Sequence, residues 1–167
     1  YEGISIQYSI EDEPLGTGGA IKKAIEKAQQ DCFVLNGDTF FDVSLSTVLD
    51  NHISQNADAT LALSHQTNFD RYGSVDVDTF KRVNAFKEKQ FMREGWINGG
   101  VYLLSHKLFD KVYAVRGSIL PQKFSFETEV LEQCVHQLNF AASLHKNYFI
   151  DIGIPEDYAR ANQTFPS

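Results

Sequence analysis

The stretch that decides the fold is AIKKAIEKAQQDCFVL, residues 20–35. Apolar residues recur within it at helical spacing, so we expect an amphipathic helix beginning at Ala20. The continuous apolar run Cys32–Leu35 is typical of a strand covered on both faces in a parallel sheet. Upstream, Ile4–Ile10 is apolar at every second position, which predicts another strand. Pro14 and three glycines predict a loop over residues 11–19. Strand, helix and strand in this order indicate an α/β domain with right-handed crossovers.

The rest of the chain continues this alternation. We expect strands at residues 59–64, 73–78, 82–86, 99–104, 140–144 and 148–152. We expect helices with the apolar faces Leu45/Val48/Leu49/Ile53, Leu108/Phe109/Val112 and Val130/Leu131/Cys134/Val135/Leu138, the first capped by Ser44, and a last helix opened by Pro155. The segments 73–78 and 82–86 are typical of antiparallel strands added to a main sheet. No repeat or linker is present, which predicts one α/β domain, 1–167, with a Rossmann-like, mixed, mainly parallel sheet flanked by helices.

The composition excludes several classes of protein. Of the 167 residues, 43% are hydrophobic and 13% aromatic, which is enough for one core and excludes a disordered chain. Fifteen Lys+Arg against 22 Asp+Glu give a net charge of −7. Nucleic-acid-binding domains usually carry a net positive charge, so binding of nucleic acid is not expected as the main task. No apolar run approaches the roughly 18 residues of a membrane span, and the start lacks a signal-peptide pattern, so we expect a cytoplasmic protein. Cys32 and Cys134 lie in apolar runs and are interpreted as buried hydrophobes.

Two aspartates each follow an apolar strand. Asp38 ends the segment Leu-Asn-Gly-Asp at 35–38, and Asp151 follows the apolar residues 148–150. Ligands of open α/β sheets bind outside the carboxyl ends of the strands, and Mg²⁺ prefers one or two carboxylates together with substrate phosphates. The two aspartates therefore form a candidate site for one metal ion. The alternative, that each aspartate only starts a turn, stays open.

Three further motifs are ambiguous when taken alone. The glycine-rich segment 16–19 offers backbone N–H groups to an anion, but no Lys-Ser or Lys-Thr pair follows to make it a P-loop. Residues 86–89, Phe-Lys-Glu-Lys, place two ammonium groups around one carboxylate, and a solvated charge run is the simpler interpretation. Asn98 precedes two glycines that let a ligand approach the backbone. Each motif has a purely structural explanation as well.

Taken together and in order, seven segments resemble the sugar-1-phosphate nucleotidylyltransferases. They are EPLGTGGA at 13–20, LNGD at 35–38, RYG at 71–73, FKEK at 86–89, INGGVY at 97–102, FSFETEVL at 124–131 and FIDIGIPEDY at 149–158. The likeness covers essentially the whole chain. Within that family, the first and last segments are most similar to guanylyltransferases that act on manno-heptose 1-phosphate, with the mannose 1-phosphate enzymes next.

The resemblance implies a nucleotide-diphospho-sugar transferase fold and a single in-line displacement at phosphorus. A phosphate oxygen of the sugar 1-phosphate attacks the α-phosphate of a nucleoside triphosphate, with GTP favoured, and pyrophosphate leaves. Positioning and cations carry such a reaction, without a covalent nucleophile. The cofactor implied is Mg²⁺, held by Asp38 and Asp151, and Lys89 completes the implied catalytic set.

The resemblance also implies the residues that bind each substrate. The implied nucleotide-binding residues are Glu11, Leu15, Gly16, Thr17, Gly18 and Asn36. The implied sugar-phosphate-binding residues are Gly73, Glu88, Lys89 and Asn98. An acidic residue at position 11 favours guanine, because a carboxylate accepts from both the ring N–H and the exocyclic amine of that base. The alternative is that Glu11 is one more solvated acid in the run 11–13.

The chain departs from the family pattern at its start. The family opens with a strand, a G-x-G-T-R loop that wraps the triphosphate and a Pro-Lys-Pro segment, and none of these is present. We therefore expect a C-terminal portion that lacks the N-terminal strand–loop–helix portion, with an open sheet edge that favours a homodimer. A non-catalytic sugar-phosphate- or nucleotide-binding regulatory module is the alternative function. A metal-dependent glycosyltransferase is disfavoured, because Asp38 and Asp42 do not form a D-x-D motif.

Overall fold

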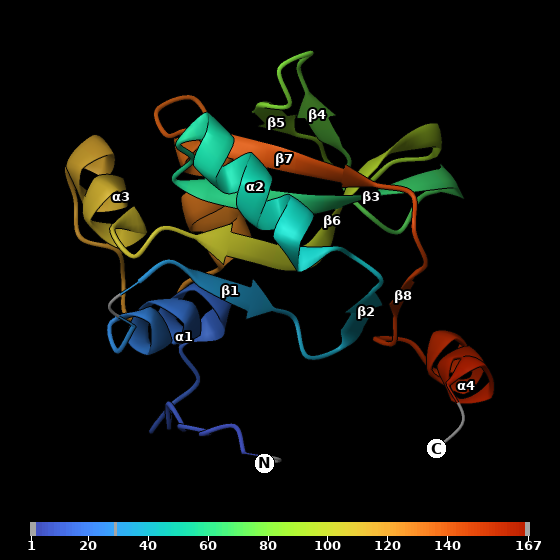
Figure 1. The fold of residues 1–167 in the computed structure, drawn as a ribbon, viewed down its shortest axis with the longest axis horizontal. Helices are drawn as coiled ribbons and strands as arrows, with labels where there is room; N and C mark the ends of the chain where they lie inside the picture. Colours follow the sequence, from blue (N-terminus) through green and yellow to red (C-terminus); the bar gives the residue numbers. More distant parts are fainter. Residues whose placement is uncertain (1–2, 29, 166–167) are drawn as a thin grey trace.

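A four-stranded sheet with the strand order β1-β6-β3-β7 organises the molecule (Figure 1). The computed structural model describes residues 3–28 and 30–165. Strand β6 (Met92–Leu104) runs antiparallel to both β1 (Cys32–Leu35) and β3 (Ala59–Phe69), and β7 (Phe140–His145) runs parallel to β3. Three of the four strands therefore share one direction, which confirms the mixed α/β sheet.

Helices cover both faces of this sheet. The side chains of β3 and β6 alternate between the faces, as the pleat of a strand requires. Leu61 and Tyr102 point into a large core closed by α1 (Gly16–Ile25), α3 (Leu108–Arg116) and the π-helix η1 (Glu127–Glu132). Ala62 and Val101 point to the opposite face, where Val48 of α2 (Leu45–Gln55) packs on them. None of the helices in the described residues is long and apolar enough to cross a membrane.

Two small ribbons flank the main sheet. Strands β4 (Val75–Val77) and β5 (Val83–Phe86) form an antiparallel hairpin. Isolated bridges tie this hairpin to the main sheet at β6 and at β7. Strands β2 (Thr39–Phe41) and β8 (Phe149–Asp151) form the second ribbon, and α4 (Pro155–Thr164) follows β8. In Figure 1 this second ribbon and α4 extend from one side of the sheet. The predicted antiparallel strands are confirmed, but they form a separate two-stranded sheet and are not added to the main sheet.

A bulge in β6 lies next to the second ribbon. The partner of Ala62 is Val101, but the partner of Leu63 is Asn98, so two glycines of β6 have no partner on β3. The sequence signals this irregularity, because glycine inside a strand marks a bulge or a close approach. Gly100 has φ +71°, a conformation that side-chain-bearing residues rarely adopt.

Several local predictions are confirmed. Ser44 caps α2 by accepting a hydrogen bond from the Thr47 N–H, and Pro155 opens α4. Cys32–Leu35 is a strand as predicted, but the prediction of a strand covered on both faces in a parallel sheet is wrong, because β1 is an edge strand that pairs antiparallel with β6 and leaves Leu35 exposed. The residues predicted for the inner face after position 126 are all buried: Val130, Leu131, Cys134, Val135 and Leu138. Both cysteines are free, and burial raises the pKa of each thiol; Cys134 is buried and Cys32 half-buried.

Three further predictions are wrong. Residues 4–10 form no strand, and Ile6, Tyr8 and Ile10 are 56–77% exposed, because the described chain supplies no neighbouring strand for their alternating pattern. Helix α1 begins at Gly16, so the glycines predicted to be a loop form its first turn. The buried residues of α2 are Val48 and His52, while Leu45, Leu49 and Ile53 are exposed.

Candidate active site

A cavity of about 750 Å³ lies where the sheet rule predicts a ligand. Residues that follow the carboxyl ends of β1 and β3 line it, together with β8 and the bulge of β6. This position agrees with the general placement of ligand sites in open α/β sheets. Its lining includes Asn36, Asp38, Arg71, Tyr72, Gly73, Lys89, Asn98, Gly100, Tyr102, Glu127 and Asp151.

The second ribbon brings Asp38 and Asp151 together. Thr39 of β2 pairs with Asp151 of β8, and the Ile152 N–H donates to the Asp38 carbonyl oxygen at 2.9 Å. Both residues line the same cavity. One Asp151 carboxylate oxygen accepts from the Gly153 N–H at 2.8 Å, which fixes the direction of this side chain. The structure therefore places both predicted aspartates at one edge of the molecule.

The cations of the cavity have different surroundings. Arg71 pairs with Asp157 at 2.6 Å, and the hydrogen bond to that carboxylate raises the pKa of the guanidinium. Asp157 is buried and also meets Arg160 at 2.8 Å. Lys89 forms no ion pair within the described residues, so its ammonium group is the cation most available to an anionic ligand. Burial, followed by the charge of Asp151, raises the pKa of Tyr72 and keeps its hydroxyl protonated.

A smaller cavity of about 270 Å³ adjoins the first. Four residues line both cavities: Gly73, Lys89, Asn98 and Glu127. The smaller cavity adds Glu88 and Lys87, the latter 3.8 Å from Asp76. The predicted sugar-phosphate residues Gly73, Glu88, Lys89 and Asn98 are thus neighbours around one region. They come from three separate segments of the chain.

Close backbone approaches shape the wall between these cavities. A side chain at Gly73 would place its Cβ 2.5 Å from the Lys87 carbonyl oxygen, a distance that real Cβ atoms essentially never show. The Lys87 N–H in turn donates to the Ser74 carbonyl at 2.8 Å. At Gly100, a Cβ would lie 2.8 Å from the Asn36 side-chain nitrogen. Both glycines let polar segments lie closer together than other residues would allow.

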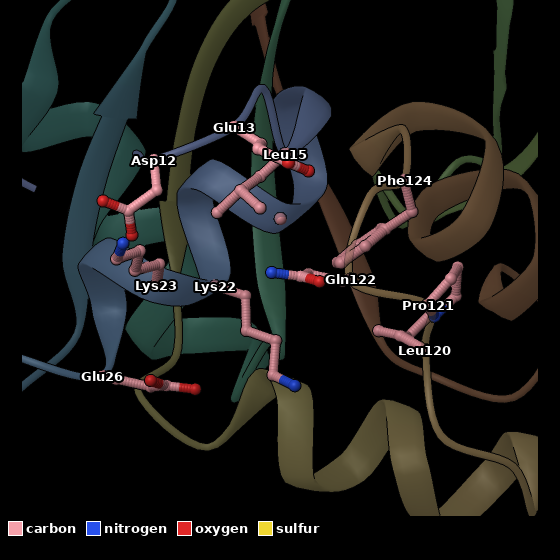
Figure 2. Close-up of a pocket in the computed structure, with 11 residues that line it drawn as sticks. Asp12, Glu13, Leu15, Lys22, Lys23, Glu26, Leu120, Pro121, Gln122 and Phe124 are labelled. Carbon is pink, nitrogen blue, oxygen red and sulfur yellow. The ribbon is translucent and has the colours of Figure 1, made fainter. Parts of the chain in front are cut away.

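The predicted nucleotide-binding residues are only partly brought together. Asn36 lines the main cavity. Leu15 lines a different cavity of about 570 Å³ between α1 and residues 120–124, into which Lys22 and Gln122 extend (Figure 2). The Glu11 carboxylate accepts from the Leu15 N–H at 2.8 Å, ahead of α1. Glu11 therefore supports the start of the helix and is not among the residues that line these cavities.

The first turn of α1 binds the segment 124–127. The Gly18 N–H donates to the Phe124 carbonyl at 3.0 Å, so it is already occupied by the protein. The Thr17 hydroxyl donates to Glu127 at 2.9 Å and accepts from the Phe126 N–H at 2.9 Å. Gly16, with φ +71°, begins the helix beside the Phe124 backbone. In this structure the turn joins two parts of the fold.

No role follows from the sequence for Arg71, Tyr72, Tyr102 and Glu127, which also line the main cavity. Arg71 and Tyr72 belong to the Arg-Tyr-Gly segment, so a signal was present without an assigned task. Tyr102 and Glu127 gave a weaker signal, because an aromatic residue in a strand and an acid in a helix are ordinarily structural. Only the folded chain shows that they meet.

Comparisons with known proteins find a matching family profile and similar chains. The family profile described as nucleotidyl transferase matches residues 1–167. D-glycero-alpha-D-manno-heptose 1-phosphate guanylyltransferase from Aneurinibacillus thermoaerophilus is 49% identical over 164 residues, which are 98% of this chain and 68% of that protein. The protein of the same name from Campylobacter jejuni is 47% identical over 93% of this chain and 66% of its own length. This chain thus spans about two thirds of the length of these relatives.

Solved structures are similar as well. The crystal structure of HddC from Yersinia pseudotuberculosis is 37% identical, with a TM-score of 0.76, and the match covers 93% of this chain and 64% of that one. A second crystal structure of HddC, complexed with GMP-PN, has a TM-score of 0.75 at the same identity and the same coverage of both chains. The matched profile spans the full 167 residues, and two relatives approach half identity. This chain belongs to the nucleotidyl transferase family.

Proposed function

We propose that this chain serves a guanylyltransferase reaction, in which GTP and manno-heptose 1-phosphate or mannose 1-phosphate give a nucleotide sugar and pyrophosphate. The observation that carries the proposal is the position of Asp38 and Asp151 at the same end of the β2–β8 ribbon, in one cavity with Lys89 and Asn98. The names of the relatives support the substrate class. The relative from Aneurinibacillus thermoaerophilus, which is 49% identical, is named for heptose 1-phosphate. A mannose-1-phosphate guanylyltransferase from Mycobacterium tuberculosis is 32% identical over 96% of this chain and 44% of that protein.

A divalent cation fits the donor set of the cavity. Asp38, Asp151 and Glu127 line it together with Lys89 and Arg71, and Arg71 is already paired with Asp157. A phosphate group entering this space would meet more negative than positive charge. Mg²⁺ binds through one or two carboxylates, with substrate phosphates and water completing its shell, so Asp38 and Asp151 would hold it. When bound, the ion supplies neutralisation of the charge on the phosphate oxygens.

The chain's own residues would bind and orient the two substrates. The Lys89 ammonium would hold the phosphate of the sugar, because lysine is a compact point charge suited to phosphate. Glu88 and Asn98, beside the Gly73 backbone, would hydrogen-bond the hydroxyls. A phosphate oxygen so oriented forms a bond to the α-phosphorus of GTP, the bond to the bridging oxygen breaks, and pyrophosphate carries away the charge. The proposed nucleotide-binding residues are Glu11, Leu15, Gly16, Thr17, Gly18 and Asn36.

The proposal is tested by pyrophosphate release and by direct binding. The chain is incubated with GTP, Mg²⁺ and either mannose 1-phosphate or D-glycero-D-manno-heptose 1-phosphate, and calorimetry measures binding of each compound separately. We expect pyrophosphate only when GTP and a sugar 1-phosphate are both present. Binding of both substrates without pyrophosphate release would favour the regulatory module instead. Absence of sugar 1-phosphate binding would overturn the proposal.

A further inference from the structure

Tyr102 is a buried polar residue at the edge of the candidate site. Its side chain is 1% exposed, and its ring packs edge-on against Phe126 with the ring centroids 5.4 Å apart. Its hydroxyl accepts a hydrogen bond from the Asn98 side-chain nitrogen at 2.7 Å, and the Glu127 carboxylate is near enough for its charge to act on the hydroxyl. Asn98 and Glu127 both line the two adjoining cavities. One buried hydroxyl thus adjoins two polar groups that line both cavities.

The direction of each hydrogen bond in this cluster is fixed. Burial, followed by the negative charge of Glu127, raises the pKa of Tyr102 far above its usual value, so the hydroxyl keeps its proton. The Asn98 amide N–H donates to the hydroxyl oxygen, which leaves the hydroxyl proton available to the neighbouring Glu127 carboxylate. The Asn98 amide oxygen accepts from the Gly100 N–H at 3.2 Å. Flipping the amide would place two donors against each other at Gly100, so only one orientation satisfies the network.

The Glu127 carboxylate is held from a second side. One of its oxygens accepts from the Thr17 hydroxyl at 2.9 Å and from the Ser125 hydroxyl at 3.0 Å. A carboxylate has about four acceptor positions, so these two bonds leave capacity for further donors. Glu127 lies on the wall of the cavity that holds Glu88. Its remaining capacity is suited to a ligand hydroxyl.

We propose that Tyr102 is a positioning residue that holds the Asn98 amide and the Glu127 carboxylate in the orientation needed to bind the hydroxyls of the sugar 1-phosphate, and that Glu127 is a specificity-determining residue for that sugar. The inference rests on the proposed function, because it assigns the sugar side of the same site. The phosphate is bound elsewhere, at Lys89, so the Tyr102 hydroxyl acts on recognition of the sugar ring. This separation makes the two contributions measurable independently.

The test compares sugar 1-phosphate with inorganic phosphate as calorimetric probes. We expect Tyr102→Phe to raise the Kd for mannose 1-phosphate about tenfold, the equivalent of one hydrogen bond, and to leave the Kd for inorganic phosphate unchanged. Tyr113→Phe is the matched control, because it removes the same atom from an exposed tyrosine of α3. That control should bind both probes as the wild type does.

A merely structural role would give a different result. Tyr102→Phe would then lower Tm while its Kd for mannose 1-phosphate stayed that of the wild type, and this would overturn the inference alone. Weaker binding of both probes by the same factor would also overturn it. If Tyr102→Phe fails to fold, Ser125→Ala removes a different donor to Glu127 and must weaken only the sugar probe. A wild-type chain that binds no sugar 1-phosphate would overturn the proposed function, and the inference with it.

Discussion

Replacing Gly73 with alanine tests the tight wall between the two cavities. The added Cβ would lie 2.5 Å from the Lys87 carbonyl oxygen, whereas ordinary contact begins at 3.4 Å. The chain around Lys87 must therefore move by about 0.9 Å, the difference between these distances. Overpacking of this kind costs about 1–3 kcal/mol, which lowers Tm by roughly 2–12 °C for a chain of this size.

The same displacement reaches the binding residues. Lys89 is two residues beyond Lys87, and a shift of about 1 Å is enough to spoil hydrogen-bond geometry. We expect the Kd for mannose 1-phosphate, measured by calorimetry, to rise about tenfold. Thermal melting of the same samples gives the stability loss. Both effects follow from one contact between a backbone oxygen and a methyl group.

Gly95→Ala is the matched control for this prediction. Its Cβ would lie 3.3 Å from the end of the Phe69 ring, a contact that a small ring movement relieves. This variant should melt within about 2 °C of the wild type, since small shape changes are tolerated best, and bind mannose 1-phosphate normally. If Gly73→Ala behaves like Gly95→Ala in both measurements, the two segments are not packed as described and the reasoning is refuted.

Three further predictions concern single side chains. Asp151→Asn should lower pyrophosphate release at least about a hundredfold, because it removes a charge that would hold the metal ion. Tm should change little, because the amide oxygen still accepts from the Gly153 N–H. Retained activity would exclude this carboxylate from the site. Glu11→Gln should weaken the preference for GTP over ATP, UTP, CTP and dTTP in the same assay, whereas an unchanged preference would leave Glu11 as a support of α1 alone. Burial lowers the pKa of His52 below the ordinary 6.5, although the charges of Asp31 and Asp58 oppose this shift. The unfolded chain, in which this histidine has its ordinary pKa, therefore binds more protons than the folded chain near that pH. As a result, folding stability that is present above about pH 6.5 is lost as the pH falls. Tm should fall less between about pH 7.5 and 5.5 in His52→Gln than in the wild type or the exposed control His136→Gln.

The local fold was predictable wherever short-range chemistry decides it. The apolar run of β1, the Ser44 cap of α2 and Pro155 at the start of α4 depend on neighbours within one helical turn or strand. The alternation of residues 4–10 was equally clear, but a strand requires a hydrogen-bonded neighbour, and the described chain provides none there. Periodicity describes one strand at a time and does not show its partner.

The residues of the candidate site that follow apolar strands were predictable from the sequence, whereas most of the other residues that line its cavity were not. Asp38 and Asp151 could be found because each follows an apolar run, but the sheet rule accounts only for Asp38, which follows β1, since β8 lies outside the four-stranded sheet. The three-residue strand β2 that aligns them is too short to show a period, so its pairing with β8 was not foreseen. Tyr102 and Glu127 are 25 positions apart and meet only through the packing of η1 on β6.

The β2–β8 ribbon gives the two aspartates a spacing that is independent of their own conformers. Thr39 stands opposite Asp151, and the Ile152 N–H reaches the Asp38 carbonyl, so the backbone ladder sets how far apart the two residues begin. Losing or gaining one residue inside β2 would therefore shift Asp38 by one register position relative to β8 and change the distance between the two aspartates, although the four-stranded sheet would be untouched. Natural variation in length should accumulate in the connections at residues 42–44 and 146–148, while the strands themselves keep a constant number of residues.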